Sequence, residues 1–176
     1  MLFRSALIQA CIQHDYKIEE MLLKYGANPN LVDDDGNSPL YYLCSGSSDP
    51  ELIPLMKPMA LALLKRGARV NAKNEWGATP LIEAASYLPA EDIKLLIKHG
   101  ANVNSQDNEG RTALMYASHR LATDVMKVLL DAGANRHLRD HQSRIALDYT
   151  RLQQFDGSRF IRLSGQPDEE AVQMLR

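Results

Sequence analysis

Apolar and small side chains recur at helical spacing through the middle of the chain. Leu81, Ala84 and Ala85 stand at positions i, i+3 and i+4, which places them on one face of an α-helix. A few residues later, a second apolar face is formed by Ile93, Leu95, Leu96 and Ile97. The pattern predicts two short consecutive amphipathic helices, each with one side turned away from water.

Capping residues set the limits of this helix pair. Thr79 is a suitable N-cap because its hydroxyl can accept a hydrogen bond from an amide of the first turn, and Pro80 fits the first helical position. Pro89 cannot continue the first helix, so the acidic segment 90–92 opens the second one, where the helix dipole favours negative charge. Gly100 then ends the pair, as expected of a residue in the left-handed conformation.

The same pattern returns along the chain with a period of 33 residues. The recurring Gly-Ala pairs are Gly67-Ala68, Gly100-Ala101 and Gly133-Ala134. The recurring helix starts are Thr79-Pro80-Leu81, Thr112-Ala113-Leu114 and, in degraded form, Ile145-Ala146-Leu147. A period of 33 with a GAxxN turn and a Thr-Pro-Leu helix start resembles the ankyrin repeat.

The resemblance implies an all-α repeat solenoid of about five stacked helix-turn-helix units with β-hairpin fingers, capped at both ends. We expect one ankyrin-repeat domain over residues 1–176. Its expected units are 1–25, 26–66, 67–99, 100–132 and 133–176. Units must stack because none can bury its apolar face alone.

The first two units depart from the regular pattern. The first has no finger before it, as in a capping unit or where a longer protein has been cut, and its second helix is predicted over 17–25 with Ile18, Met21 and Leu22 inward. The second unit has eight extra residues, which fall in the segment 45–58. We expect a loop there that is either tolerated or an accessory contact, with Pro58 opening the next helix.

The last unit departs from the family pattern as well. Ser143 replaces the finger glycine and Ile145 replaces the capping Thr. We expect a long loop that includes 155–167, followed by a closing helix over 168–176. The histidine of the family's TPLH motif is absent throughout, which is expected to weaken local hydrogen bonding. Its place is taken by Ile8, Tyr41, Ile82, Met115 and Asp148.

One column of small residues supports the alignment of the units. Its members are Cys11, Cys44, Ala85, Ser118 and Arg151. The first four are small enough for close helix stacking, and the charged last one suits a unit with no neighbour beyond it. Equivalent sites in adjacent helices lie roughly 8–10 Å apart, whereas a disulfide needs Cα atoms within about 7 Å. We therefore expect two buried free thiols.

No catalytic, metal or cofactor site is predicted. His137 and His141 have metal-like spacing but fall in a finger without a third ligand, and no residues form a nucleophile triad or a phosphate loop. A formal charge of −2 argues against a general nucleic-acid binder. No apolar run is long enough to span a membrane, so a cytoplasmic location is the default and a secreted effector the alternative.

Ankyrin-like arrays bind other macromolecules, so the resemblance implies a non-enzymatic protein–protein interaction scaffold. The partner, a protein or peptide, would occupy a concave surface formed by finger tips and first helices. The candidate contact residues are Asp34, Asp35, Asn37, Lys73, Glu75, Trp76, Tyr87, Asn108, Arg111, Arg120, Arg139 and Arg144. The alternatives are an enzyme inhibitor of antitoxin or immunity type, a secreted bacterial effector engaging a host protein, a structural fragment of a larger array and, less favoured, nucleic-acid binding. A monomer is the default expectation.

Trp76 is the strongest single candidate. It is the only tryptophan, and a finger tip has no packing need for it, so it is either a contact residue or folded against its own or a neighbouring finger. Tryptophan is also enriched among the residues that dominate interfaces. The candidate charges are polarised along the array, acidic in the early fingers (33–35) and basic in the later ones. Although any single charge can simply be solvated, this order would orient a partner of opposite polarity.

Overall fold

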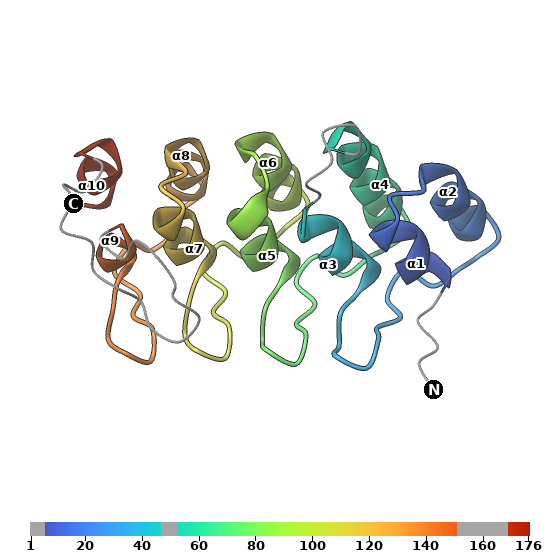
Figure 1. Cartoon of the computed structure of the whole chain (residues 1–176), viewed down its shortest axis with the longest axis horizontal. Helices are drawn as coiled ribbons and strands as arrows, with labels where there is room; N and C mark the ends of the chain where they lie inside the picture. Colours follow the sequence, from blue (N-terminus) through green and yellow to red (C-terminus); the bar gives the residue numbers. More distant parts are fainter. Residues whose placement is uncertain (1–5, 47–52, 151–168) are drawn as a thin grey trace.

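The structure is a computed structural model, and it describes residues 6–46, 53–150 and 169–176. Its described helices lie side by side in pairs along one row (Figure 1). They are α1 (Ala6–Ile12), α2 (Tyr16–Lys24), α3 (Pro39–Cys44), α4 (Ile53–Lys65), α5 (Pro80–Tyr87), α6 (Ala90–Lys98), α7 (Ala113–His119), α8 (Thr123–Asp131), α9 (Ala146–Tyr149) and α10 (Glu169–Leu175). The predicted all-α repeat solenoid is confirmed.

The helices form two layers that run the length of the array. The first helices of the pairs contact one another in an unbroken series from α1 through α3, α5 and α7 to α9. The second helices lie on top of them, α2 against α4, and α6, α8 and α10 in sequence (Figure 1). The predicted closing helix is present as α10, which buries Ala171, Val172 and Leu175 and contacts α8 and α9. The predicted loop 155–167 lies outside the described residues.

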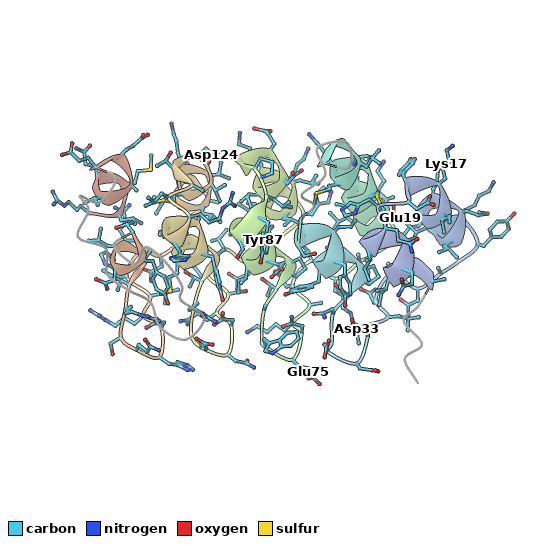
Figure 2. All side chains as sticks on the ribbon, in the orientation of Figure 1. Lys17, Glu19, Asp33, Glu75, Tyr87 and Asp124 are labelled. Carbon is cyan, nitrogen blue, oxygen red and sulfur yellow. The ribbon has the colours of Figure 1, made fainter. Side chains whose placement is uncertain are left out.

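Fingers project from the first helices on the side away from the second helices (Figure 1). We define the finger tips as residues 33–37, 74–78, 107–111 and 140–144; in each, the N–H of the first residue donates to the carbonyl of the last. Figure 2 shows Glu75 at one of these tips. The described residues form no strand, only an isolated antiparallel bridge between Gln106 and Thr112. The residue after each tip is the N-cap of the next helix, so little extended chain is left in which a ladder could form.

The helix starts are capped as the sequence predicts. The hydroxyl of Thr79 accepts a hydrogen bond from the Ile82 N–H at 3.3 Å, and that of Thr112 accepts one from the Met115 N–H at 3.3 Å. Two residues that replace the missing histidine restore part of its bonding. The Met115 sulfur accepts from the Thr112 N–H at 3.4 Å, and the Asp148 carboxylate accepts from the Ile145 N–H at 3.0 Å.

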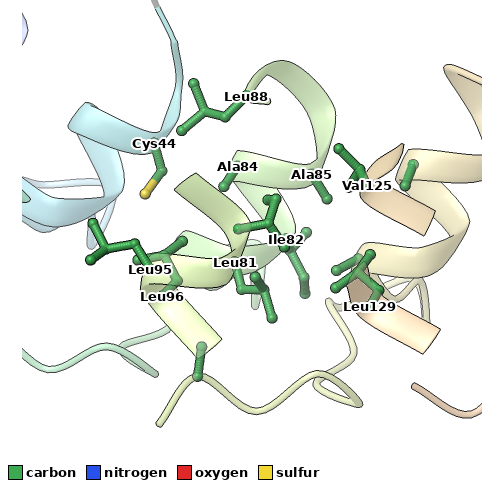
Figure 3. Close-up of a cluster of buried hydrophobic side chains, with 14 of the residues drawn as sticks. Cys44, Leu81, Ile82, Ala84, Ala85, Leu88, Leu95, Leu96, Val125 and Leu129 are labelled. Atoms are coloured by element: carbon green, nitrogen blue, oxygen red, sulfur yellow. The ribbon is translucent and has the colours of Figure 1, made fainter. Parts of the chain in front are cut away.

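The buried apolar side chains form one cluster that runs through the array. Figure 3 shows the part of it around Leu81, Ala84 and Leu96. Four members of the small-residue column, Cys11, Cys44, Ala85 and Ser118, are all buried, which confirms that this column stacks between units. The fifth member, Arg151, lies outside the described residues. Both cysteines are free and buried, as predicted.

The prediction for the start of the fourth helix was wrong. Pro58 does not open α4 but lies inside it, since the helix begins at Ile53. The proline removes one backbone hydrogen bond. Met56, Met59 and Leu63 are nevertheless fully buried, and this apolar contact on both sides of the proline outweighs the lost bond. Part of the predicted loop 45–58 is therefore helix.

The predicted inward face of α2 was also wrong for two of its three residues. Ile18 and Met21 are 42% and 52% exposed, whereas Glu19 is fully buried (Figure 2). Neither carboxylate oxygen of Glu19 has a hydrogen-bond partner. Burial, with a smaller contribution from the charge of Glu20, raises the pKa of Glu19 to about 8. A buried site of this kind suits an apolar side chain better than a carboxyl group. The hydrophobic periodicity of the sequence therefore did not predict that Glu19 would be the buried residue.

Stability is expected to fall between about pH 4.5 and pH 8, because Glu19 stays protonated in the folded chain while it ionises in the unfolded one. Each pH unit in that window costs up to ~1.4 kcal/mol. Urea unfolding across this range should show Glu19→Gln to be more stable than the wild type near pH 8, with a smaller dependence on pH. The control Glu75→Gln changes an exposed glutamate in a finger tip and should follow the wild type. Equal pH dependence in Glu19→Gln and the wild type would contradict this expectation.

Candidate partner-binding surface

The finger tips are joined to one another by backbone hydrogen bonds. The Glu75 N–H donates to the Asp35 carbonyl at 3.0 Å, and the Asn108 N–H donates to the Trp76 carbonyl at 2.9 Å. The same bond recurs from the His141 N–H to the Glu109 carbonyl at 2.9 Å. These tip-to-tip bonds hold adjacent fingers at a fixed spacing.

A second recurring link uses the asparagine of each GAxxN turn. Asn71 donates from its side-chain amide to the Gly100 carbonyl at 2.9 Å, and its side-chain oxygen accepts from the Asn102 N–H at 2.8 Å. Asn30 and Asn104 make the same pair of bonds to the next unit. These asparagines belong to the GAxxN motif, which the sequence analysis interpreted only as a turn. That interpretation did not predict that they join neighbouring units.

Charged side chains of the later fingers are held in internal clamps. The Asp140 carboxylate accepts from the Arg144 side chain at 2.7 Å and from the Tyr149 hydroxyl at 2.6 Å. The Arg144 guanidinium also lies over the Tyr149 ring, 4.9 Å from its centre. Burial opposes ionisation, but the hydrogen bonds from Tyr149 and Arg144 lower the pKa of Asp140 below its usual value.

An equivalent clamp occurs one unit earlier. Asp107 accepts from the Arg111 side chain at 3.2 Å and from the Tyr116 hydroxyl at 2.8 Å, and the Arg111 guanidinium lies 5.2 Å from the centre of the Tyr116 ring. In the second unit Tyr42 likewise donates to Asp33. The repeated spacing of five residues from Arg to Tyr is the signal in the sequence that could have revealed both arginine clamps.

Three of the candidate contact residues are largely buried as well as bonded within the fold. Arg111 and Arg144 are in the clamps, with side chains only 20% and 18% exposed. Asn37 is 5% exposed, and its side-chain oxygen accepts from the Asn74 amide at 2.9 Å. Their direct role in partner binding remains a prediction. In the structure, the side chain of each one makes hydrogen bonds that stabilise the fold.

Trp76 is presented differently from these residues. Its side chain is 55% exposed, while its backbone is fixed at both ends. The Trp76 N–H donates to the Asn74 side-chain oxygen at 3.1 Å, and its carbonyl accepts from Asn108. The tip thus holds the indole ring out to solvent on a rigid backbone.

Tyr87 is also exposed, at 59%, but it stands at the last position of α5 (Figure 2). Trp76 lies in the finger tip before that helix. Seven residues of helix between Pro80 and Tyr87 span about 10 Å. The structure therefore places the two aromatic residues at opposite ends of the first helix and its finger, and does not join them in one patch.

The remaining candidates lie on the exposed side of the tips and first helices. Asp34, Asp35 and Glu75 are exposed acidic side chains. Lys73 is exposed and its ammonium group donates to the Gln106 carbonyl at 2.7 Å, and the exposed Asn108 donates its amide to the Glu75 carbonyl at 2.7 Å. Each of these groups is accessible to a partner.

Two exposed arginines mark the later part of the same surface. The Arg120 guanidinium donates to the carbonyls of Ala85 and Leu88, at 3.2 and 3.4 Å, and so lies across the end of α5. Arg139 donates to the Ser143 carbonyl at 2.5 Å. The candidate surface is therefore acidic in the early tips and retains basic groups farther along.

Within the described residues, no cluster of three or more His, Cys, Asp or Glu side chains could hold a metal ion. Among the same residues, no helix has both the length and the hydropathy needed to cross a membrane.

Comparison with known proteins bears on the repeats directly. A family model described as ankyrin repeats (many copies) matches residues 7–56, and one described as ankyrin repeats (3 copies) matches residues 55–140. The chain is 37% identical over 84 residues to ankyrin repeat and SOCS box protein 16 of Homo sapiens, a match that covers 47% of this chain and 17% of that protein. It is 40% identical over 68 residues to a probable serine/threonine-protein kinase of Dictyostelium discoideum, covering 38% of this chain and 8% of the kinase.

Substituting Gly77 should disturb the tip that carries Trp76. Gly77 has a φ of +71°, and a Cβ atom there would lie 2.9 Å from the Asn108 backbone nitrogen and would clash with its side-chain oxygen. Gly67 has a similar φ of +83° but open space around it. Both alanine variants incur about 1–2 kcal/mol for the left-handed backbone. Thermal unfolding should show Gly77→Ala to be the less stable variant, because it also displaces Asn108; equal stability would contradict the importance of this contact.

Proposed function

The chain belongs to the ankyrin repeat family, whose repeats are generally protein–protein interaction modules, and we propose that it is a non-enzymatic scaffold that binds a protein or peptide partner. The binding surface is formed by the exposed side chains of the finger tips and first helices, centred on Trp76. The chain covers less than a fifth of either relative, so the proposal rests on the surface itself and takes nothing from the kinase activity or the SOCS box in their names.

The presentation of Trp76 is the observation that carries the proposal. A large aromatic side chain contributes most to an interface when little freedom is lost on binding. Trp76 meets this condition because its own backbone bonds and the adjacent finger fix the tip before any partner arrives.

The exposed charges of the surface favour one orientation of the partner along the array. Asp34 and Asp35 are exposed in the first tip, and Arg120 and Arg139 are exposed two or more units later. A partner with basic groups toward the first tip and acidic groups toward the last would be steered into one register. The clamps reduce the basic surface by withdrawing Arg111 and Arg144, which disfavours nucleic-acid binding further.

Replacing Trp76 by alanine should weaken partner capture. Affinity capture from the native lysate, followed by quantification of each recovered protein, should identify a partner that is lost with Trp76→Ala. The loss should be about 30-fold or more in affinity, the factor that corresponds to a dominant interface residue. Tyr25→Ala is the control, because Tyr25 is an aromatic residue 81% exposed at the far end of the second helix layer. Capture that is unchanged by Trp76→Ala would contradict the proposed centre of the surface.

Reversing the acidic charges of the first tip should slow association. Asp34→Lys combined with Asp35→Lys is expected to lower the on-rate several-fold at low ionic strength, with the difference shrinking as salt screens the charges. Asp124→Lys with Asp131→Lys, on the exposed outer side of α8, gives the same change in net charge away from the tips. Stopped-flow or surface-binding kinetics with the captured partner would test this. Equal on-rates for the two double variants at low salt would reject the orientation.

A further inference from the structure

The third unit of the array lacks the arginine clamp of the two units that follow it. Each clamp has an aspartate at the first position of the finger tip, an arginine four residues later and a tyrosine nine residues later. The same three positions of the third unit hold Asn74, Ala78 and Glu83. This unit therefore has a carboxylate in place of the tyrosine and no arginine.

Glu83 nevertheless takes part in a similar arrangement. Its carboxylate accepts a hydrogen bond at 2.8 Å from the hydroxyl of Tyr41, which lies on the preceding first helix, α3. Tyr116 and Tyr149 donate in the same way to the aspartates of their own clamps. Glu83 is only partly buried, and it has no ion-pair partner among the described residues. The site thus contains the carboxylate and the tyrosine of a clamp without its arginine.

The missing arginine leaves Glu83 with fewer hydrogen bonds than a clamp carboxylate. Asp140 accepts bonds from Arg144, from the Tyr149 hydroxyl and from two backbone amides, and although burial opposes ionisation, these bonds keep the pKa of Asp140 below its usual value. Within the described residues, Glu83 accepts a bond only from Tyr41. Burial raises the pKa of Glu83 above its usual value, although the Tyr41 bond opposes the shift. A guanidinium beside this carboxylate would offset the cost of burying its charge.

The place of the missing arginine can be reached from solvent. At the corresponding sites the side chains of Arg111 and Arg144 are 20% and 18% exposed, so the clamps lie at the surface of the array. Ala78 has no side chain long enough to fill the site from within. The exposed ring of Trp76 belongs to the same finger tip, and the exposed acidic side chains of the first two tips favour the approach of a basic segment.

We propose that the partner supplies an arginine whose guanidinium pairs with Glu83 and completes the clamp of the third unit. This inference rests on the proposed function, since the arginine belongs to the protein or peptide that docks at Trp76. Arginine fits the site better than lysine, because its planar guanidinium can bond a carboxylate through two N–H groups. It can also lie over the ring of Tyr41, as Arg144 lies over that of Tyr149.

Selection from a library of random short peptides tests the chemistry of the partner. With the full chain as bait, the retained peptides should be enriched in arginine. The strongest binder is then compared with the same peptide carrying citrulline in place of its arginine, which keeps the shape of the side chain and removes the charge. Calorimetry should show that citrulline weakens binding at least ~10-fold. A selection without arginine enrichment, or equal affinities of the two peptides, would overturn the proposal.

Variants of the chain locate the site. Glu83→Gln keeps an acceptor for the Tyr41 hydroxyl but removes the charge, so it should bind the arginine peptide at least ~10-fold more weakly and no longer distinguish it from the citrulline peptide. Ala78→Arg supplies the missing cation from within and should also weaken binding, with unchanged circular dichroism. The control Glu91→Gln, on the outer helix α6, should bind as the wild type does. Equal affinity of Glu83→Gln and the wild type for the arginine peptide would overturn the proposal.

The arginine site and the proposed surface around Trp76 fail on different results. Binding that is lost in Trp76→Ala but retained in Glu83→Gln would overturn the arginine site and support the surface. Binding that is lost in Glu83→Gln but retained in Trp76→Ala would support the arginine site and overturn Trp76 as the centre of the surface.

Discussion

Contact between neighbouring helix pairs holds this chain together, because a pair of short helices has more apolar surface than it can cover by itself. The small residues Cys11, Cys44, Ala85 and Ser118 let the first helices approach closely along the whole row. The same dependence explains the two irregular places near the start. α4 tolerates Pro58 because Met56, Met59 and Leu63 of the same helix are buried. α2 exposes Ile18 because no described helix pair lies on that side.

Hydrogen bonds between polar groups fix the register of the helix pairs that apolar contact brings together. Once the pairs are in register, the asparagine links and the tip-to-tip bonds recur at every step where both partners are described. The clamps around Asp107 and Asp140 add charged groups to this framework. Arg111 and Arg144, which the sequence placed among the candidate contact residues, thereby become structural, and fewer of the candidates stay exposed.

Local signals in the sequence predicted the fold well. Thr79, Pro80 and Gly100 act within one turn of the backbone, so their meaning does not depend on distant contacts. Prediction from the sequence failed where the place of a residue depends on contacts that exist only in the folded chain. It placed Pro58 at a helix start, because it could not weigh the burial that keeps the helix going. It counted Arg144 among the free side chains, because a ring five residues away becomes a partner only after folding. The partner-binding role of the candidate residues remains untested.

The tip-to-tip bonds have a consequence for how such a surface evolves. They run between backbone amides and carbonyls, as from Asn108 to Trp76, and so make no demand on the side chain at either position. At exposed tip positions such as Trp76, mutation can therefore exchange one side chain for another while the finger stays where it is, whereas Asp107 and Asp140 are fixed by their hydrogen bonds. At such positions the backbone atoms fix the finger and the side-chain atoms are available for recognition. Selection can therefore alter what the array binds without changing its fold.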